Sequence, residues 1–145
     1  MMNGVPNSPM NRYFQVEDAV VKNNTYINCD NIQLCAGSDS ERSATPINSE
    51  ISDNIFYHDK LNNIFTIYDD ISGIKFDNNI TSSNIETGIP SGFVKRDMKL
   101  VKNEMGFLIP ESAALKAKVT ISPEIATKEN TGVSWYSKED KNVAL

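Results

Sequence analysis

The side chain best suited to acid–base chemistry is His58, the only histidine of the chain, which stands beside Asp59 on a predicted turn. An imidazole next to a carboxylate could act as a general base or bind a metal ion. No second histidine or nearby cysteine completes such a site. We therefore interpret His58 as a solvated turn residue.

Five aspartates in the middle of the chain could together offer oxygen ligands to Ca²⁺. They are Asp53, Asp59, Asp69, Asp70 and Asp77. Their spacing lacks the alternating D-x-D-x-D-G pattern of a calcium-binding loop, so we interpret them as a charged, solvated rim. We expect neither a metal ion nor any other cofactor.

The two cysteines, Cys29 and Cys35, stand in a C-x5-C spacing, which suits neither a zinc site nor a thioredoxin-like pair. Met1 is not followed by a basic and then apolar segment, so the sequence predicts no secretory signal and a chain made and kept in a cytosol. In that compartment both cysteines should be reduced thiols. A disulfide across a hairpin is the alternative.

Aromatic side chains are the remaining candidates for binding. Tyrosines can stack on a sugar ring or form hot spots of an interface, and here they are Tyr13, Tyr26, Tyr57, Tyr68 and Tyr136. We favour ordinary half-buried packing for them and keep a surface glycan as the alternative. The sequence has no glycine-rich phosphate loop, nucleophile elbow or metal-spaced cluster. It therefore predicts no catalytic residue and a protein that is not an enzyme.

Composition limits the class of partner. The 145 residues suffice for one ordinary domain or two small ones, and 39% hydrophobic with 23% charged residues is typical of a globular protein. The net charge of −5 opposes binding to nucleic acid. No apolar run approaches the roughly 20 residues that cross a bilayer, so no membrane partner is expected.

Short alternating segments between turn formers predict an all-β protein. Apolar side chains alternate in residues 13–22, and residues 25–29 can run back beside them after the Asn23-Asn24 turn, which predicts a β-hairpin. Three short apolar runs, 55–57, 64–68 and 74–76, then predict a β-meander. Asn-Ile pairs recur at irregular spacing, so no solenoid repeat is predicted.

Glycine and proline are densest just before the last third of the chain, and we place a linker there, at residues 88–93. The sequence thus predicts an extended N-terminal arm at 1–12, a β-rich domain at 13–87 and a second unit at 94–145. Within the second unit, the stretch that ends at Lys102 carries both signs of charge and is predicted to be a strand.

The strongest alternation is in the last thirty-one residues. Leu115, Ala117, Val119 and Ile121 alternate with polar residues, which predicts a strand with one apolar face. After a polar turn, Trp135 returns to the inward face as a core residue.

This region resembles the group-2 bacterial immunoglobulin-like domains. The resemblance is carried by Pro123, Ala126-Thr127, Val133-Ser134-Trp135-Tyr136-Ser137, Asp140 and Val143-Ala144. It implies a partial Ig-like β-sandwich over 94–145, of the kind found in bacterial surface proteins and in structural proteins of tailed phages, with no catalytic residues. The family pattern continues into further strands where this sequence ends at Leu145, so either those strands come from elsewhere or the sandwich is incomplete, and we expect a second copy or a partner to supply the β-pairing.

These observations predict a non-enzymatic structural component of a phage virion, such as a head fibre, decoration or tail accessory protein assembled in the host cytoplasm. It would act through β-contacts between subunits, with other virion proteins and further copies of itself as partners. The alternative is a bacterial surface adhesion or carbohydrate-binding Ig-like module.

Overall fold

The computed structural model describes residues 1–8 and 13–111, which form short β-strands joined by turns and contain no helix. It follows that these residues hold no helix long and apolar enough to cross a membrane. The all-β prediction is confirmed for this part of the chain.

Eleven strands are formed by the described residues, each of three or four residues. They are β1 (Val20–Lys22), β2 (Thr25–Ile27), β3 (Ile32–Leu34), β4 (Ser49–Ser52), β5 (Ile55–Tyr57), β6 (Phe65–Ile67), β7 (Ile74–Asp77), β8 (Asn79–Ser82), β9 (Phe93–Arg96), β10 (Leu100–Lys102) and β11 (Leu108–Pro110).

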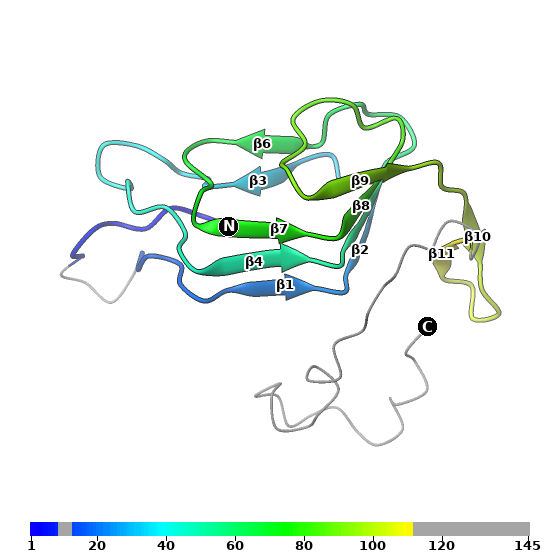
Figure 1. Cartoon of the computed structure of the whole chain (residues 1–145), viewed down its shortest axis with the longest axis horizontal. Coiled ribbons are helices and arrows are strands. Elements are labelled where there is room, and N and C mark those ends of the chain that lie inside the picture. Colours follow the sequence, from blue (N-terminus) through cyan, green and yellow to red (C-terminus); the bar gives the residue numbers. More distant parts are fainter. Residues whose placement is uncertain (9–12, 112–145) are drawn as a thin grey trace, which may run out of the picture.

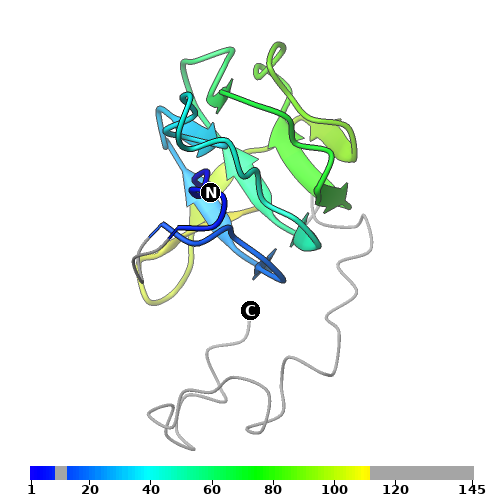
Figure 2. The same ribbon diagram turned by 90° about the vertical axis from the view of Figure 1, so that its left-hand side faces the viewer.

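The first nine strands wind into the coils of a parallel β-helix (Figure 1). Three sheets have the orders β1-β4-β7, β2-β5-β8-β9 and β3-β6, and every pairing within them is parallel. The first two coils, β1-β2-β3 and β4-β5-β6, each contribute one strand to each sheet in turn; β7 and β8 continue the first two sheets, and β9 pairs with β8. Figure 2, turned by 90°, looks along several of these strands, which lie around a common interior.

The predicted β-hairpin and β-meander are therefore wrong, although several strand positions are right. β1 and β2 do not pair with each other, because β1 pairs with β4 and β2 pairs with β5. Asn23, between them, has a φ of 58° and bends the chain from one sheet into the next. A left-handed Asn is typical of hairpin turns as well as of such corners, so the residue type alone did not distinguish them.

The chain also has the structural repeat that the sequence did not predict. Asn24 bonds to Asn54 across 30 residues, and Asn54 bonds to Asn79 across 25 residues. The Asn-Ile pairs that begin at Asn54 and Asn79 occupy equivalent places in successive coils. Unequal coil lengths hide this repeat from a search for one fixed period.

At the corner after the first strand of each coil, the amides of Asn24, Asn54 and Asn79 form a stack that we call the asparagine ladder. The Asn24 side chain donates to Asn54 Oδ1 at 3.1 Å, and the Asn54 side chain donates to Asn79 Oδ1 at 3.0 Å. Asn54 and Asn79 are fully buried. The ladder lets polar groups lie inside the coils because their hydrogen bonds are made within the stack and to backbone carbonyls.

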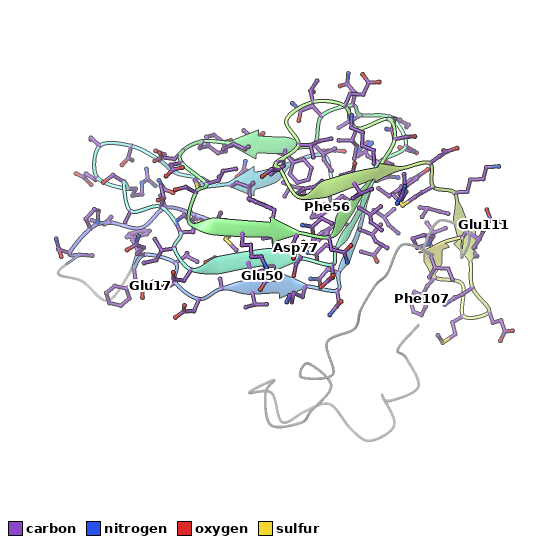
Figure 3. The ribbon with its side chains drawn as sticks, in the orientation of Figure 1. Glu17, Glu50, Phe56, Asp77, Phe107 and Glu111 are labelled. Carbon is purple, nitrogen blue, oxygen red and sulfur yellow. The ribbon has the colours of Figure 1, made fainter. Side chains whose placement is uncertain are left out.

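Aromatic rings fill the interior beside this ladder. Phe56 stacks on Tyr26 with ring centroids 4.7 Å apart, and it contacts Phe65 and Phe93 at 5.3 and 5.5 Å. Figure 3 shows Phe56 among the coils. Offset and edge-to-face pairs of this kind add about 1 kcal/mol each to the free energy of burial.

The described part of the predicted arm lies against the coils. Asn3 donates its backbone N–H to Ala36 at 3.0 Å, and Gly4 exchanges two backbone hydrogen bonds with Ala44. A Cβ on Gly4 would lie 2.5 Å from the backbone nitrogen of Gln15, so only glycine fits this approach.

The predicted linker 88–93 connects residues that are in direct contact. β9 pairs with β8, and Gly92 passes so close to β7 that a Cβ there would lie 2.2 Å from the carbonyl oxygen of Phe76. Residues on the two sides of the linker thus share one sheet, while the domain limits themselves stay a prediction.

Beyond β9, strands β10 and β11 form an antiparallel hairpin. Before this hairpin, Met98 is buried with Ile55 and Ile80 in a second, smaller apolar cluster. The predicted strand 115–121 and the core position of Trp135 lie outside the described residues.

Candidate functional site

His58 has both ring nitrogens committed to structural hydrogen bonds. Nδ1 accepts the backbone N–H groups of Lys60 and Leu61 at 3.1 and 2.9 Å, so this nitrogen carries no proton. Nε2 therefore carries the proton and donates to Asp30 Oδ1 at 3.0 Å. The residue is 4% exposed, so the prediction of a solvated side chain is wrong. An imidazole held in this way is not available as a general base.

The surroundings of His58 form another corner of the coils, between the second and third strands of a coil, which we call the histidine corner. The Asn84 side chain donates to the carbonyls of His58 and Leu61 at 2.8 and 2.9 Å. Asn28 Oδ1 accepts the N–H of Asp59 at 3.0 Å, which connects the first coil to the second. The corner is thus a structural network of unlike residues.

The five aspartates do not gather into one site. Asp53 accepts from Asn78, Asp70 from Ser72, and Asp77 pairs with Lys75. Hydrogen bonds from Ser38, Asp70 and Asn3 lower the pKa of Asp69. Across residues 1–8 and 13–111, no cluster of three His, Cys, Asp or Glu side chains could hold a metal ion.

Cys29 and Cys35 are both free cysteines in the structure, while their reduced state stays a prediction. Cys35 is fully buried and its Sγ lies 3.2 Å from the carbonyl oxygen of Asp70. Burial raises the pKa of the Cys35 thiol, and the Asp69 carboxylate raises it further. A thiol with a raised pKa forms little thiolate near neutral pH and is a poor nucleophile.

The tyrosines divide between packing and surface positions. Tyr26 packs on Phe56, and burial raises the pKa of its hydroxyl. Tyr13 and Tyr68 are about half exposed and come from different parts of the coils, while Tyr136 lies outside the described residues. No shared aromatic platform results among the described tyrosines.

A charged surface lies on the outer side of the sheet β1-β4-β7, and we call it the paired face. It carries Lys22, Glu50, Lys75 and Asp77, of which Glu50 and Asp77 are labelled in Figure 3. Lys22 pairs with Glu50 at 3.1 Å and Lys75 pairs with Asp77 at 3.4 Å. Burial raises the pKa of Glu50, but the hydrogen bonds from Lys22 and Ser52 and the positive charges of Lys22 and Lys75 together outweigh it, so this pKa lies below its usual range. The positive charges of this face are therefore already neutralised.

A second charged surface follows β9 and β10, and we call it the basic strip. Its four cations, Lys95, Arg96, Lys99 and Lys102, are all exposed. Asp97 is the one acidic residue within this span of sequence. The excess of cations over acidic residues in this span is the signal in the sequence that could have predicted the strip.

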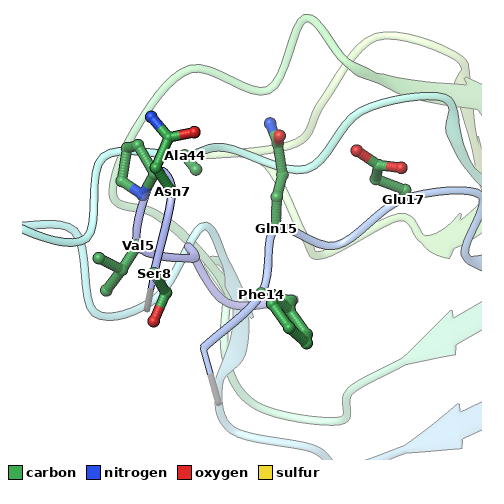
Figure 4. Close-up of a pocket in the computed structure, with 8 residues that line it drawn as sticks. Val5, Asn7, Ser8, Phe14, Gln15, Glu17 and Ala44 are labelled. Atoms are coloured by element: carbon green, nitrogen blue, oxygen red, sulfur yellow. The ribbon is translucent and has the colours of Figure 1, made fainter. Parts of the chain in front are cut away.

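A shallow pocket of about 440 Å³ lies beside the N-terminal residues. Figure 4 shows that it is lined by Val5 and Asn7 on one side and by Gln15 and Glu17 on the other. Glu17 is the one titratable side chain of its lining. The pocket therefore lacks the pair of acid–base groups that a catalytic site requires.

One family model and solved structures of known proteins match this chain over most of its length. A family model described as chondroitinase B matches residues 1–121. The structure of the PL6 family alginate lyase AlyGC matches with 44% sequence identity and a TM-score of 0.75, over 94% of this chain. An arginine-to-alanine variant of AlyGC gives the same values. The match covers 19% of the AlyGC chain, so this chain spans about a fifth of that structure's length. No curated protein matches the chain.

These findings correct the functional hypotheses drawn from the sequence. The resemblance to group-2 Ig-like domains is wrong, because the matched family and structures are polysaccharide lyases and the strands are mostly parallel. The phage virion component, the adhesion module and the virion partners are overturned by the same matches, and so is the prediction that the protein is no enzyme. Its location in a virion stays an untested prediction.

The family match spans most of the chain, including every described strand. The match to AlyGC reaches a similar extent with nearly half of the residues identical. The chain belongs to the chondroitinase B family.

Proposed function

We propose that this chain supplies β-helix coils of a polysaccharide lyase that acts on an acidic polysaccharide, with alginate as the first substrate to test. The observation that carries the proposal is the 44% identity to an alginate lyase over 94% of the chain. Alginate is a polymer of uronic acids, so such a substrate carries a carboxylate on every sugar.

A lyase of this kind breaks the glycosidic bond by elimination. A base removes the proton from the carbon that bears the carboxylate, the bond between the neighbouring carbon and the glycosidic oxygen breaks, that oxygen takes up a proton to become a hydroxyl, and a carbon–carbon double bond remains at the new chain end. This chemistry needs a base and a group that neutralises the carboxylate.

The described residues do not bring such a set together. His58 uses both ring nitrogens within its corner, and Cys35 is a buried thiol with a raised pKa. We therefore assign the described coils a supporting role, in which the asparagine ladder and the aromatic core hold a rigid stack. The groups that perform the elimination would come from outside these residues.

A chimaera tests this assignment. Residues 1–111 of this chain replace the equivalent residues of AlyGC, and cleavage of alginate is followed by the ultraviolet absorbance of the new double bond. We expect activity within about tenfold of AlyGC, because a stack of the same coil geometry should support the rest of the enzyme. The Asn54→Ala chimaera, in which the ladder is broken, is the matched control and should lose thermal stability and activity together.

Two results would contradict the proposal. One is a chimaera that melts at the temperature of AlyGC but does not cleave alginate or chondroitin. The other is cleavage by the 145-residue chain alone that is abolished by His58→Ala, which would place the chemistry at the histidine corner.

A further inference from the structure

We infer that the basic strip of Lys95, Arg96, Lys99 and Lys102 binds an anionic polysaccharide chain. The inference rests on the proposed function for the class of ligand, and on the charge and placement of these side chains for the site.

The cations of the strip have no carboxylate partner within residues 1–8 and 13–111. The ion pairs formed there involve Lys22, Arg42, His58 and Lys75 instead. Lys95 Nζ has a hydrogen bond of 3.4 Å, but its acceptor is the backbone carbonyl of Glu86. Against a net charge of −5 for the whole chain, an uncompensated group of cations is a local exception. Such a group attracts polyanions over about a Debye length.

The strip is held in place by the structure around it. Arg96 lies opposite Ser82 in the pairing of β9 with β8. Met98, in the middle of the strip, is 6% exposed and packs on Ile55 and Ile80. The carbonyl of Lys99 accepts the N–H of Glu111 at 2.8 Å. The backbone that carries the four cations is therefore ordered before any ligand binds, which lowers the entropic cost of binding.

The extended course of the strip suits a linear polymer. At about 3.3 Å per residue, the seven steps from Lys95 to Lys102 span at most about 23 Å. Side chains of neighbouring residues on an extended segment point to alternate sides, so the cations border the segment rather than form one compact pocket. A polymer with a charge on each sugar can contact several such cations in succession, whereas a single small anion cannot.

Cations on an edge strand can also serve only to prevent wrong pairing with another strand. The two roles differ in their consequences. Cations that only prevent strand pairing would keep the protein monomeric and would not bind alginate. The experiment below therefore measures both binding and association.

The test compares two variants of the 145-residue chain with equal net charge. The strip variant combines Lys95→Gln, Arg96→Gln, Lys99→Gln and Lys102→Gln. The control combines Lys22→Gln, Arg42→Gln, Lys60→Gln and Lys75→Gln. Each takes the net charge from −5 to −9, since four positive charges are removed.

Binding of alginate is measured by calorimetry at low and moderate salt, with uncharged dextran as the comparison polymer and sedimentation as the measure of association. We expect the wild type to bind alginate with an affinity that falls as salt rises. The strip variant should bind at least about tenfold more weakly, at roughly twofold for each exposed charge, and the control should stay within about threefold.

The inference is overturned if both variants lose affinity equally, if dextran binds as well as alginate, or if the wild type does not bind alginate at low salt. The inference is also overturned if the strip variant self-associates while its affinity for alginate is unchanged, because the cations would then only prevent pairing with another strand. Failure here leaves the lyase proposal standing, since the chimaera assay measures cleavage of alginate, which can proceed in the chimaera whether or not the strip itself binds the polymer.

Discussion

The asparagine ladder and the histidine corner both turn the chain from one sheet of the coil to the next, but they are built in different ways. In the ladder, the same amide recurs in three coils, and each side chain bonds to its copy in the next. In the histidine corner, Asn28, His58, Ser82 and Asn84 hold the same coils together by unlike contacts. The ladder therefore repeats one kind of hydrogen bond from coil to coil, whereas the histidine corner uses a different contact at each step.

The difference has an energetic consequence. An amide offers both a donor and an acceptor, so a stack of identical amides satisfies itself at any number of coils. Unlike residues satisfy one another only in their particular arrangement, and some of them lie at the rim, as Asp30 does with a side chain that is 83% exposed. We therefore expect substitutions in the ladder to lower the free energy of unfolding by more than substitutions in the histidine corner do.

Asn54→Ala should have the largest effect on stability. Its amide group donates to the carbonyls of Val21 and Ser52 at 2.8 Å each and accepts the backbone N–H of Asn24 at 3.0 Å. Losing the amide leaves several buried polar groups without partners, at about 1 to 3 kcal/mol each. We expect the free energy of unfolding to fall by about 3 kcal/mol or more, measured by urea denaturation of the 145-residue chain.

The matched control is Asn62→Ala, an exposed asparagine whose side chain makes no hydrogen bond to the described residues. It should change the free energy of unfolding by less than about 0.5 kcal/mol. If both variants lost the same free energy of unfolding, the ladder would contribute no more to stability than an exposed asparagine does.

His58→Ala should come second, with a loss of about 2 kcal/mol. The substitution leaves the N–H groups of Lys60 and Leu61 without their acceptor, and part of that loss is recovered because this turn lies near solvent. His58→Asn places a carbonyl oxygen near the position of Nδ1, so it should recover about half of the stability. If His58→Ala lowered the free energy of unfolding by more than Asn54→Ala in the same urea experiment, the histidine corner and not the ladder would contribute more to stability.

The two corners also explain what the sequence could predict. The strands predicted at 25–29, 55–57, 64–68 and 74–76 overlap β2, β5, β6 and β7, because local alternation and turn residues determine where a strand lies. The direction of pairing depends on which distant strand is adjacent, and alternation with period two is the same for parallel and antiparallel neighbours.

The ladder leaves a signal of the repeat in the sequence. Asn23-Asn24, Asp53-Asn54 and Asn78-Asn79 each place a left-handed residue before a ladder amide, with φ values of 58°, 55° and 48° at the first positions. Their separations of 30 and 25 residues differ by five, so a test for equal spacing rejects them. At the histidine corner, the residues that follow β2 and β5 differ in type, Asn28 and His58, and the buried imidazole could not be foreseen from a lone histidine beside an aspartate.

Asn23 allows the left-handed turn before the ladder to be separated from the ladder itself. Its side chain is exposed, and its φ of 58° is strained for a β-branched residue but not for glycine. We expect Asn23→Val to lower the free energy of unfolding by about 1 to 2 kcal/mol, and Asn23→Gly to leave it within about 0.5 kcal/mol. Urea denaturation midpoints of the two variants measure this, and equal loss in both would mean that the asparagine side chain rather than the backbone angle is needed.

Asp30→Asn should have the smallest effect and tests the rim of the histidine corner. Asp30 accepts the Nε2 proton of His58 at 3.0 Å, and an asparagine carbonyl oxygen can accept the same proton. Because the Asp30 side chain is mostly exposed, solvent screens its charge, and the free energy of unfolding at neutral pH should change by less than about 0.5 kcal/mol. A loss as large as that of His58→Ala would mean that the carboxylate charge, and not only a hydrogen-bond acceptor, holds the imidazole. The histidine corner would then be an electrostatic unit, and its contrast with the uncharged ladder would be one of charge as well as of repetition.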